Sequence, residues 1–108
     1  MDLRLGEFEQ LVLLALVRLG DEAYGVAVHA EIARQTGRET SFGTVYTTLA
    51  RLEEKGLITS RMGDPTPERG GRRKKYFLML PAGLRALRAS LHAIRTMMRG
   101  LDASWERP

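Results

Sequence analysis

The first strong pattern in the chain is a run of apolar residues at helical spacing over residues 7–19. One stripe of this predicted helix comprises Phe8, Leu11, Val12, Ala15 and Leu19. The other side is filled largely by Leu13, Leu14, Leu16 and Val17. A helix that is apolar on most sides is buried on more than one face. Because so small a chain offers few internal partners for the second face, we expect that face to meet a second copy of the protein.

A second helix is predicted over residues 24–35, with Val28 and Ile32 facing inward and Gly37 just after its end. Gly25 near its start is unusual, because glycine inside a helix costs ~1 kcal/mol relative to alanine. Close approach by a neighbouring helix would justify that cost.

A third helix is predicted over residues 42–55, where Ser41 is a favourable N-cap and Gly56 ends the helix. Its inward stripe is narrow and consists of Val45, Leu49 and Leu52. The outward face is small and rich in hydroxyl groups, with Gly43, Thr47, Ala50, Arg51 and Glu54 flanked by Thr44 and Tyr46. An ordinary solvated face would carry more long charged side chains, so this face suits close approach by a partner.

Residues 57–62 and 75–80 read as two short strands. The segment between them carries prolines at 65 and 67 and glycines at 63, 70 and 71, which favour turns. The sequence therefore predicts a β-hairpin. Four consecutive cations lie where its tip enters the second strand, namely Arg72, Arg73, Lys74 and Lys75.

A fourth helix is predicted to begin at Pro81 and to run to Leu101 or beyond. Its apolar residues alternate in steps of three and four: Leu84, Leu87, Leu91, Ile94, Met98, Leu101 and Trp105. This spacing is an a/d heptad seam, the pattern of a helix that pairs with another helix. The seam predicts a homodimer interface, although the same residues would also suit packing against their own domain.

The order of these elements predicts a mainly α protein with a small β-hairpin, in the α+β class. We expect residues 1–80 to form a winged helix-turn-helix and residues 81–108 a C-terminal dimerisation helix, together one compact unit. A length of 108 residues fits a single domain.

Composition excludes several classes of protein. The chain has no cysteine and therefore neither a disulfide framework nor a thiolate metal site. Its longest apolar run, residues 11–17, is far shorter than the ~20 residues of a membrane span. The N-terminus has no signal-peptide pattern. We expect a cytoplasmic protein that does not associate with a membrane.

The charge is distributed unevenly along the chain. Residues 1–40 carry a balance of −3, residues 41–79 carry +4, and residues 80–108 carry +3. A basic second half on an acidic first half suggests that a polyanion meets one side of the molecule.

The sequence gives little support to catalysis. His29 and His92 are the only histidines, and neither has a second metal ligand at suitable spacing. We interpret each as a surface or partly buried helix residue. No nucleophile elbow, phosphate-binding loop or dinucleotide fingerprint is present. We therefore expect no enzyme activity, no cofactor and no metal site.

Binding of double-stranded DNA explains more of the sequence. The third helix would enter the major groove with its small N-terminal side chains, and the hairpin cations would follow the flanking phosphates. The candidate residues on the helix are Ser41, Gly43, Thr44, Thr47 and Arg51. Those on the wing are Arg69, Arg72, Arg73 and Lys74. The plain alternatives are an ordinary helix surface and a solubilising hairpin tip.

The chain also resembles the PadR family of bacterial transcriptional regulators over about residues 5–101. The stretches that carry the resemblance are residues 9–16, Tyr24-Gly25, residues 43–46, residues 49–58, residues 71–77 and Gly83. The resemblance implies a winged-helix repressor that dimerises through its C-terminal helix, and it adds Tyr46 as a DNA contact. It also allows a small aromatic or drug-like effector between subunits, near Met97, Met98, Trp105 and the first helix. The alternative is that these residues form a plain interface with no effector.

Two positions depart from the family pattern. Many members have proline where this chain has Thr47, so the base preference does not carry over. Many also have threonine where this chain has Leu80, which leaves Pro81 alone to start the last helix.

We predict a sequence-specific DNA-binding transcriptional regulator, a dimeric repressor that binds an inverted-repeat operator. The alternative is a winged-helix module that binds a protein partner and no DNA. The four consecutive cations favour DNA, because a protein-binding wing has no need of them.

Overall fold

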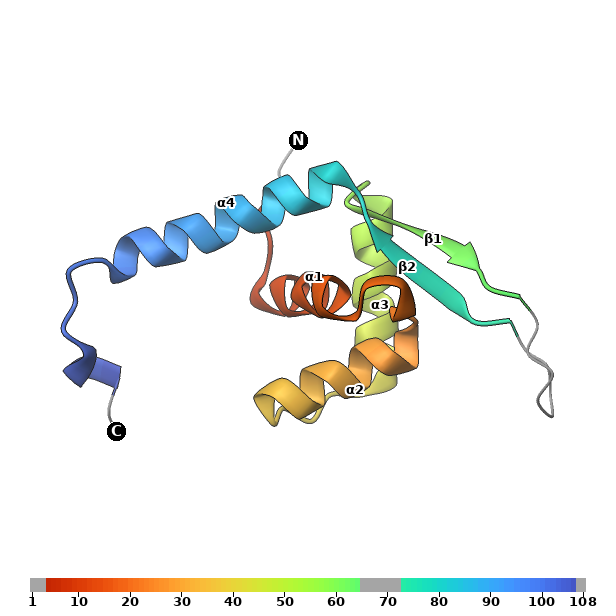
Figure 1. Ribbon diagram of the computed structural model, residues 1–108, viewed down its shortest axis with the longest axis horizontal. Coiled ribbons are helices and arrows are strands. Elements are labelled where there is room, and N and C mark those ends of the chain that lie inside the picture. The colour runs from red at the N-terminus through yellow and green to blue at the C-terminus, as the bar shows by residue number, and fades with distance from the viewer. Residues whose placement is uncertain (1–3, 65–72, 107–108) are drawn as a thin grey trace.

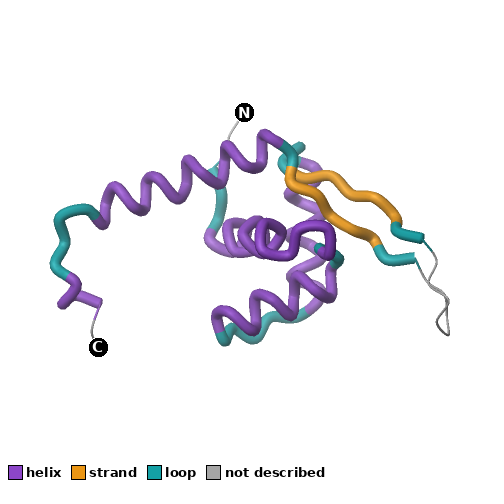
Figure 2. Tube along the Cα trace, viewed as in Figure 1, coloured by secondary structure: helices purple, strands orange, loops and turns teal. Residues whose placement is uncertain are grey.

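The computed structural model describes residues 4–64 and 73–106 of the chain. Its elements, in order, are α1 (Glu7–Leu19), the 3-10 turn η1 (Gly20–Glu22), α2 (Gly25–Thr36), α3 (Phe42–Glu54), β1 (Ile58–Met62), β2 (Lys75–Met79), α4 (Pro81–Met98) and the 3-10 turn η2 (Ala103–Glu106). The protein is mainly helical with one two-stranded antiparallel sheet, as the sequence predicts (Figures 1 and 2).

The core forms around α1, which packs against α2, α3, β2 and the first part of α4 (Figure 1). The predicted inward stripe of α3 is fully buried at Val45, Leu49 and Leu52. Other buried residues of this core include Val12, Leu13, Leu16, Val28, Ile32, Leu57, Ile58 and Phe77. Residues from all of the longer elements therefore share one hydrophobic core.

The starts of α2 and α3 follow from local side-chain chemistry. Tyr24 is the N-cap of α2, so this helix begins one residue later than predicted. The place that a Cβ of Gly25 would take is occupied by the ring of Tyr46. The close approach predicted at Gly25 is thus confirmed. At α3 the Ser41 hydroxyl accepts a hydrogen bond from the Thr44 amide at 3.1 Å, as expected of an N-cap.

The hairpin is fixed to the helices along one edge. β1 and β2 pair with Ile58 opposite Met79 and Met62 opposite Lys75. The other edge of β2 meets the segment before α2, where the Phe77 amide donates to the Ala23 carbonyl at 2.8 Å. The hairpin extends from the helical body beyond this edge (Figure 2).

α4 begins at Pro81 as predicted, with Leu80 as an N-cap that makes no side-chain cap. The predicted extension of this helix to Leu101 and beyond is wrong, because the helix ends at Met98. Gly100 takes φ +78°, a left-handed conformation that glycine adopts readily. The Asp102 side chain then accepts a hydrogen bond from the Ser104 amide, a local bond that competes with the helix. Leu101 and Trp105 therefore lie outside α4.

The heptad seam divides into two parts with different surroundings. Leu87 is 3% exposed and packs into the core of its own domain, and Leu91 packs partly against that core. This half of the seam follows the alternative interpretation given above. The second half of α4 leaves the body (Figure 1), and there the seam residues Ile94 and Met98 are 55% and 43% exposed.

Candidate nucleic-acid interface

α2 and α3 form a helix-turn-helix, and His29 links the two helices at the turn. Its Nε2 atom makes a hydrogen bond with the carbonyl oxygen of Thr40, and its ring stacks on Phe42 with centroids 4.1 Å apart. Phe42 is the first residue of α3, so these contacts fix where that helix starts. The sequence predicted His29 to be a surface or partly buried helix residue, and it is partly buried. The sequence gave no indication of its contacts across the turn.

The N-terminal end of α3 carries a hollow of about 370 Å³ on its outer side. The hollow is lined by Ser41, Gly43, Thr44, Thr47, Thr48 and Arg51. Five of these six are candidates from the sequence, and all five are exposed. Thr48 was missed because it is buried and donates its hydroxyl to the Thr44 carbonyl at 2.8 Å. The hollow offers hydroxyl groups and one guanidinium to a partner.

Tyr46 differs from the other candidates in having a packing role. Its ring lies over Gly25 at the start of α2, yet the residue remains 45% exposed. The ring is thus held between the two helices while part of it faces solvent, and it does not line the hollow.

Two buried carboxylates hold the helices that carry this surface. Glu9 of α1 accepts a hydrogen bond from Lys55 Nζ at 2.8 Å and another from the Gly6 amide at 2.9 Å. Burial raises the pKa of Glu9, but these two donors outweigh it and the pKa is lowered. Lys55 is thereby turned toward the body and away from the outer face of α3.

Glu31 of α2 is the second of these carboxylates. It accepts hydrogen bonds from Arg34, from Arg18 Nε at 2.7 Å and from Gln35 Nε2 at 3.0 Å. These donors lower the pKa of Glu31 to about 2. Arg18 belongs to α1, so this ion pair joins the first two helices.

Only part of the predicted wing site lies among the described residues. Arg73 and Lys74 are exposed at the start of the second wing segment, while Arg69 and Arg72 lie outside the described residues. Lys75 is directed differently, since its Nζ is 3.8 Å from a carboxylate oxygen of Glu53 on α3. Among the described residues, the exposed wing cations that lack an acidic partner are therefore Arg61, Arg73 and Lys74.

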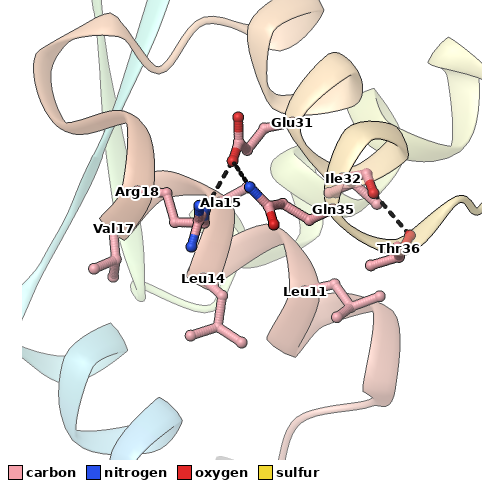
Figure 3. Close-up of a pocket in the computed structure, with 9 residues that line it drawn as sticks. All are labelled: Leu11, Leu14, Ala15, Val17, Arg18, Glu31, Ile32, Gln35 and Thr36. Carbon is pink, nitrogen blue, oxygen red and sulfur yellow. Dashed lines mark hydrogen bonds and ion pairs between the residues drawn. The ribbon is translucent and has the colours of Figure 1, made fainter.

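A groove of about 430 Å³ lies between α1 and α2 on another part of the surface (Figure 3). Its walls are mainly apolar, and the Arg18–Glu31–Gln35 contacts lie along it (Figure 3). The lining residues are Leu11, Leu14, Ala15, Val17, Arg18, Glu31, Ile32, Gln35 and Thr36. The groove contains Leu14 and Val17, two residues of the α1 face for which the sequence predicted a second partner. For Leu13 and Leu16 of that face the prediction is wrong, because both are buried in the protein's own core. Met97, Met98 and Trp105 do not line it.

A helix-turn-helix followed by a cationic hairpin defines the class of winged helix-turn-helix proteins. The profile described as the transcriptional regulator PadR-like family matches residues 13–89. The chain belongs to this family of transcriptional regulators, and the resemblance inferred from the sequence is confirmed.

Solved structures of the same family share this fold. A PadR family transcription regulator from hypervirulent Clostridium difficile is 27% identical with a TM-score of 0.68, and the match covers 86% of this chain and 95% of that one. A PadR family transcriptional regulator from Eggerthella lenta is 31% identical with a TM-score of 0.65, covering 87% and 81%.

One curated relative is an uncharacterized 37.1 kDa protein in transposon TN4556 of Streptomyces fradiae. It is 33% identical over 92 residues, which make up 85% of this chain and 24% of the relative. The chain thus spans about a quarter of the length of that relative.

Residues 4–64 and 73–106 contain neither a cluster of metal ligands nor a membrane-spanning helix. No group of three or more histidine, aspartate or glutamate residues there is arranged to hold a metal ion. Nor does any helix in these ranges combine the length and the apolar character of a membrane span.

Proposed function

We propose that this protein is a dimeric, sequence-specific transcriptional repressor that binds an inverted-repeat operator. The observation that carries the proposal is the hydroxyl-rich hollow at the N-terminal end of α3, in a chain whose following hairpin carries exposed cations. A helix that enters the major groove needs small side chains at this end so that its backbone approaches base edges and phosphates. The proposed repressor needs no cofactor, catalyses no reaction and acts in the cytoplasm.

In this proposal α3 and the wing contribute different contacts to DNA. Thr44, Thr47 and Arg51 would contact base edges, with Ser41, Gly43 and Tyr46 at the surrounding backbone. Arg73 and Lys74, together with Arg69 and Arg72 of the sequence, would neutralise phosphates. Phosphate contacts release counterions and give affinity for any sequence, whereas base contacts give the choice of operator.

Dimerisation would use the part of α4 that has no partner in its own domain. Ile94 and Met98 are exposed there, and Leu101 and Trp105 follow in the exposed tail. Leu84 and the half-buried Leu91 would lie at the border of this interface, while Leu87 belongs to the core. In this proposal residues 1–80 bind DNA and residues 81–108 join the two copies.

A small aromatic or drug-like effector would bind where the second copy closes the apolar groove of α1. Groove walls of Leu11, Leu14 and Val17 suit an aromatic ring. In this proposal Trp105 of the second copy lies beside the groove, so a change in the fluorescence of this tryptophan, the only one in the sequence, would report binding. A flat response to aromatic compounds would contradict this part of the proposal.

A gel-shift assay with the protein's own upstream region tests DNA binding. We expect a shift that weakens as salt rises, and a weaker shift on random fragments. Arg73→Ala should reduce binding to both kinds of DNA, while Arg88→Ala, the same charge change on the exposed surface of α4, should not. In a reporter strain the protein should lower transcription from that region. No salt-sensitive shift on any fragment would favour the protein-binding module instead.

A further inference from the structure

We propose that Tyr24 and Tyr76 are positioning residues that hold the wing cations Lys74 and Arg61 in place for phosphate contact. This inference rests on the proposed function, because it concerns how the wing meets DNA. Tyr24 is the N-cap of α2 and Tyr76 lies in β2, so the pair joins the helix-turn-helix to the wing.

The two rings form an edge-to-face pair at the base of the wing. Their centroids are 5.7 Å apart and their planes are inclined by 72°, which is a favourable aromatic geometry. The backbones of Tyr24 and Tyr76 also form an isolated antiparallel bridge, next to the hydrogen bond from the Phe77 amide to the Ala23 carbonyl. Side chains and backbone therefore fix β2 against the start of α2 at the same point.

Each ring also carries one cation on its face. Lys74 Nζ lies 4.4 Å from the ring centroid of Tyr24, and the guanidinium carbon of Arg61 lies 4.7 Å from that of Tyr76. Both distances are within the ~6 Å range of a cation–π interaction. Arg61 lies in β1 and Lys74 directly precedes β2, so the ring pair holds both arms of the hairpin.

These cations keep their charge available, unlike the two lysines of the same region that are paired with carboxylates. In the part of the chain that the structure describes, Lys55 and Lys75 are paired with Glu9 and Glu53, whereas Lys74 and Arg61 form no ion pair. Both are exposed. An aromatic face orders a cation without neutralising it, and ordering before binding lowers the entropy lost when DNA is bound.

Gly63 makes the ring contact sterically feasible. Its amide donates to the Lys74 carbonyl at 2.7 Å, next to the register pair of Met62 and Lys75. A Cβ at Gly63 would lie 2.6 Å from a ring carbon of Tyr76, closer than real contacts allow. The hairpin thus has glycine where the ring lies against its backbone.

The first measurement is made on the free protein. Protons above an aromatic face move upfield in NMR spectra, so the Lys74 Hε resonances should be shifted upfield in the wild type. They should return to ordinary values in Tyr24→Leu and remain shifted in Tyr24→Phe, which keeps the ring. Ordinary Lys74 shifts in the wild type would overturn the contact and the inference with it.

The second measurement is the salt dependence of DNA affinity. Each lost phosphate contact makes the plot of log K against log salt less steep by about 0.9. A variant that loses one contact therefore loses about eightfold more affinity, compared with the wild type, at 0.1 M salt than at 1 M salt. We expect this loss in Tyr24→Leu on operator and random DNA alike, with Tyr24→Phe unchanged. Because Tyr24 acts through Lys74, the double variant with Lys74→Ala should have the slope of Lys74→Ala alone. A merely structural role would give additive losses.

Circular dichroism checks that the compared proteins are folded. If Tyr24→Leu does not fold, Gly63→Ala is used instead, because the added Cβ displaces the Tyr76 ring. The NMR shifts of the Arg61 side chain then report whether the ring contact is lost. A folded variant that has lost the ring contact but keeps the wild-type slope would overturn the positioning role alone. A wild type with no salt-sensitive binding would overturn the proposed function as well, while the NMR shift would still report the contact.

Discussion

Glu31 shows how a single residue stabilises the arrangement of the first two helices. It is 4% exposed and accepts hydrogen bonds from Arg34, Arg18 and Gln35. A buried carboxylate is favourable only when its hydrogen-bonding capacity is satisfied, as it is here. The side chain therefore acts as a charged connector between α1 and α2 beneath the helix-turn-helix.

The low pKa of Glu31 makes part of the stability depend on pH. Because the folded pKa is lowered to about 2, the contribution is present above the unfolded value of ~4.3 and is lost as the pH falls toward about 2. Glu31→Gln should therefore lower the melting temperature at pH 7, and the difference between the two proteins should shrink as the pH falls from ~4.3 toward about 2. Thermal denaturation across this range measures the difference. An equal difference at pH 7 and pH 2.5 would contradict the assignment.

Residue periodicity predicted the outward side of α3 but not the contacts that cross the fold. Ser41, Thr44 and Thr47 could be placed from spacing alone, because a helix fixes which residues share a face. Thr48 points inward by the same rule, so spacing gave no sign that it borders the hollow. The Tyr24–Tyr76 pair depends on strand register and on a contact between distant segments, which no local pattern encodes.

At the scale of elements, the two faces of α3 have different roles. The inner face packs in the core and stabilises the fold, and the outer face is the one proposed to contact DNA. Leu49 is fully buried, whereas Thr47 is exposed in the hollow. Leu49→Ala should cost about 2–5 kcal/mol of unfolding free energy. Thr47→Ala should stay within about 0.5 kcal/mol of wild-type stability, as surface changes do. Urea denaturation of both variants measures these values, and equal losses would contradict the assignment of faces.

The same Thr47→Ala variant tests recognition. We expect the free-energy difference between operator and random DNA to fall by about 1–3 kcal/mol if the hydroxyl contacts a base. Arg73→Ala is the matched control, because losing a phosphate contact weakens both DNAs alike. The comparison uses dissociation constants measured at one salt concentration. A wing variant that alters sequence choice while Thr47→Ala does not would contradict the docking.

Element boundaries show the limit of sequence reasoning most clearly in α4. Pro81 marked the start correctly, since proline suits the first helical position. The heptad spacing continued through Leu101 and Trp105. Spacing shows which residues would lie on one side of a helix, but it does not show where the helix ends. Gly100 and the local hydrogen bond of Asp102 end it earlier. The spacing likewise could not tell that Leu87 enters its own core.

At the scale of the whole molecule, dimerisation is tested by substitutions in the exposed half of α4. Ile94→Glu places a charge on the exposed apolar surface without disturbing the core, unlike a change at the half-buried Leu91. We expect this variant to be monomeric at micromolar concentration in sedimentation velocity and to lose specific binding while weak nonspecific binding remains. Thr96→Glu adds the same charge at an exposed position off the seam and should stay dimeric. A dimeric Ile94→Glu would contradict this interface.

The most direct test of the central claim is a hydroxyl-radical footprint on the DNA upstream of the protein's own coding sequence. A dimer related by two-fold symmetry presents two recognition helices to one face of DNA. We therefore predict two protected half-sites in inverted orientation, with centres about one helical turn, ~10 bp, or a multiple of it apart. Uniform protection along the fragment, or a single unpaired site, would contradict a dimeric, sequence-specific repressor.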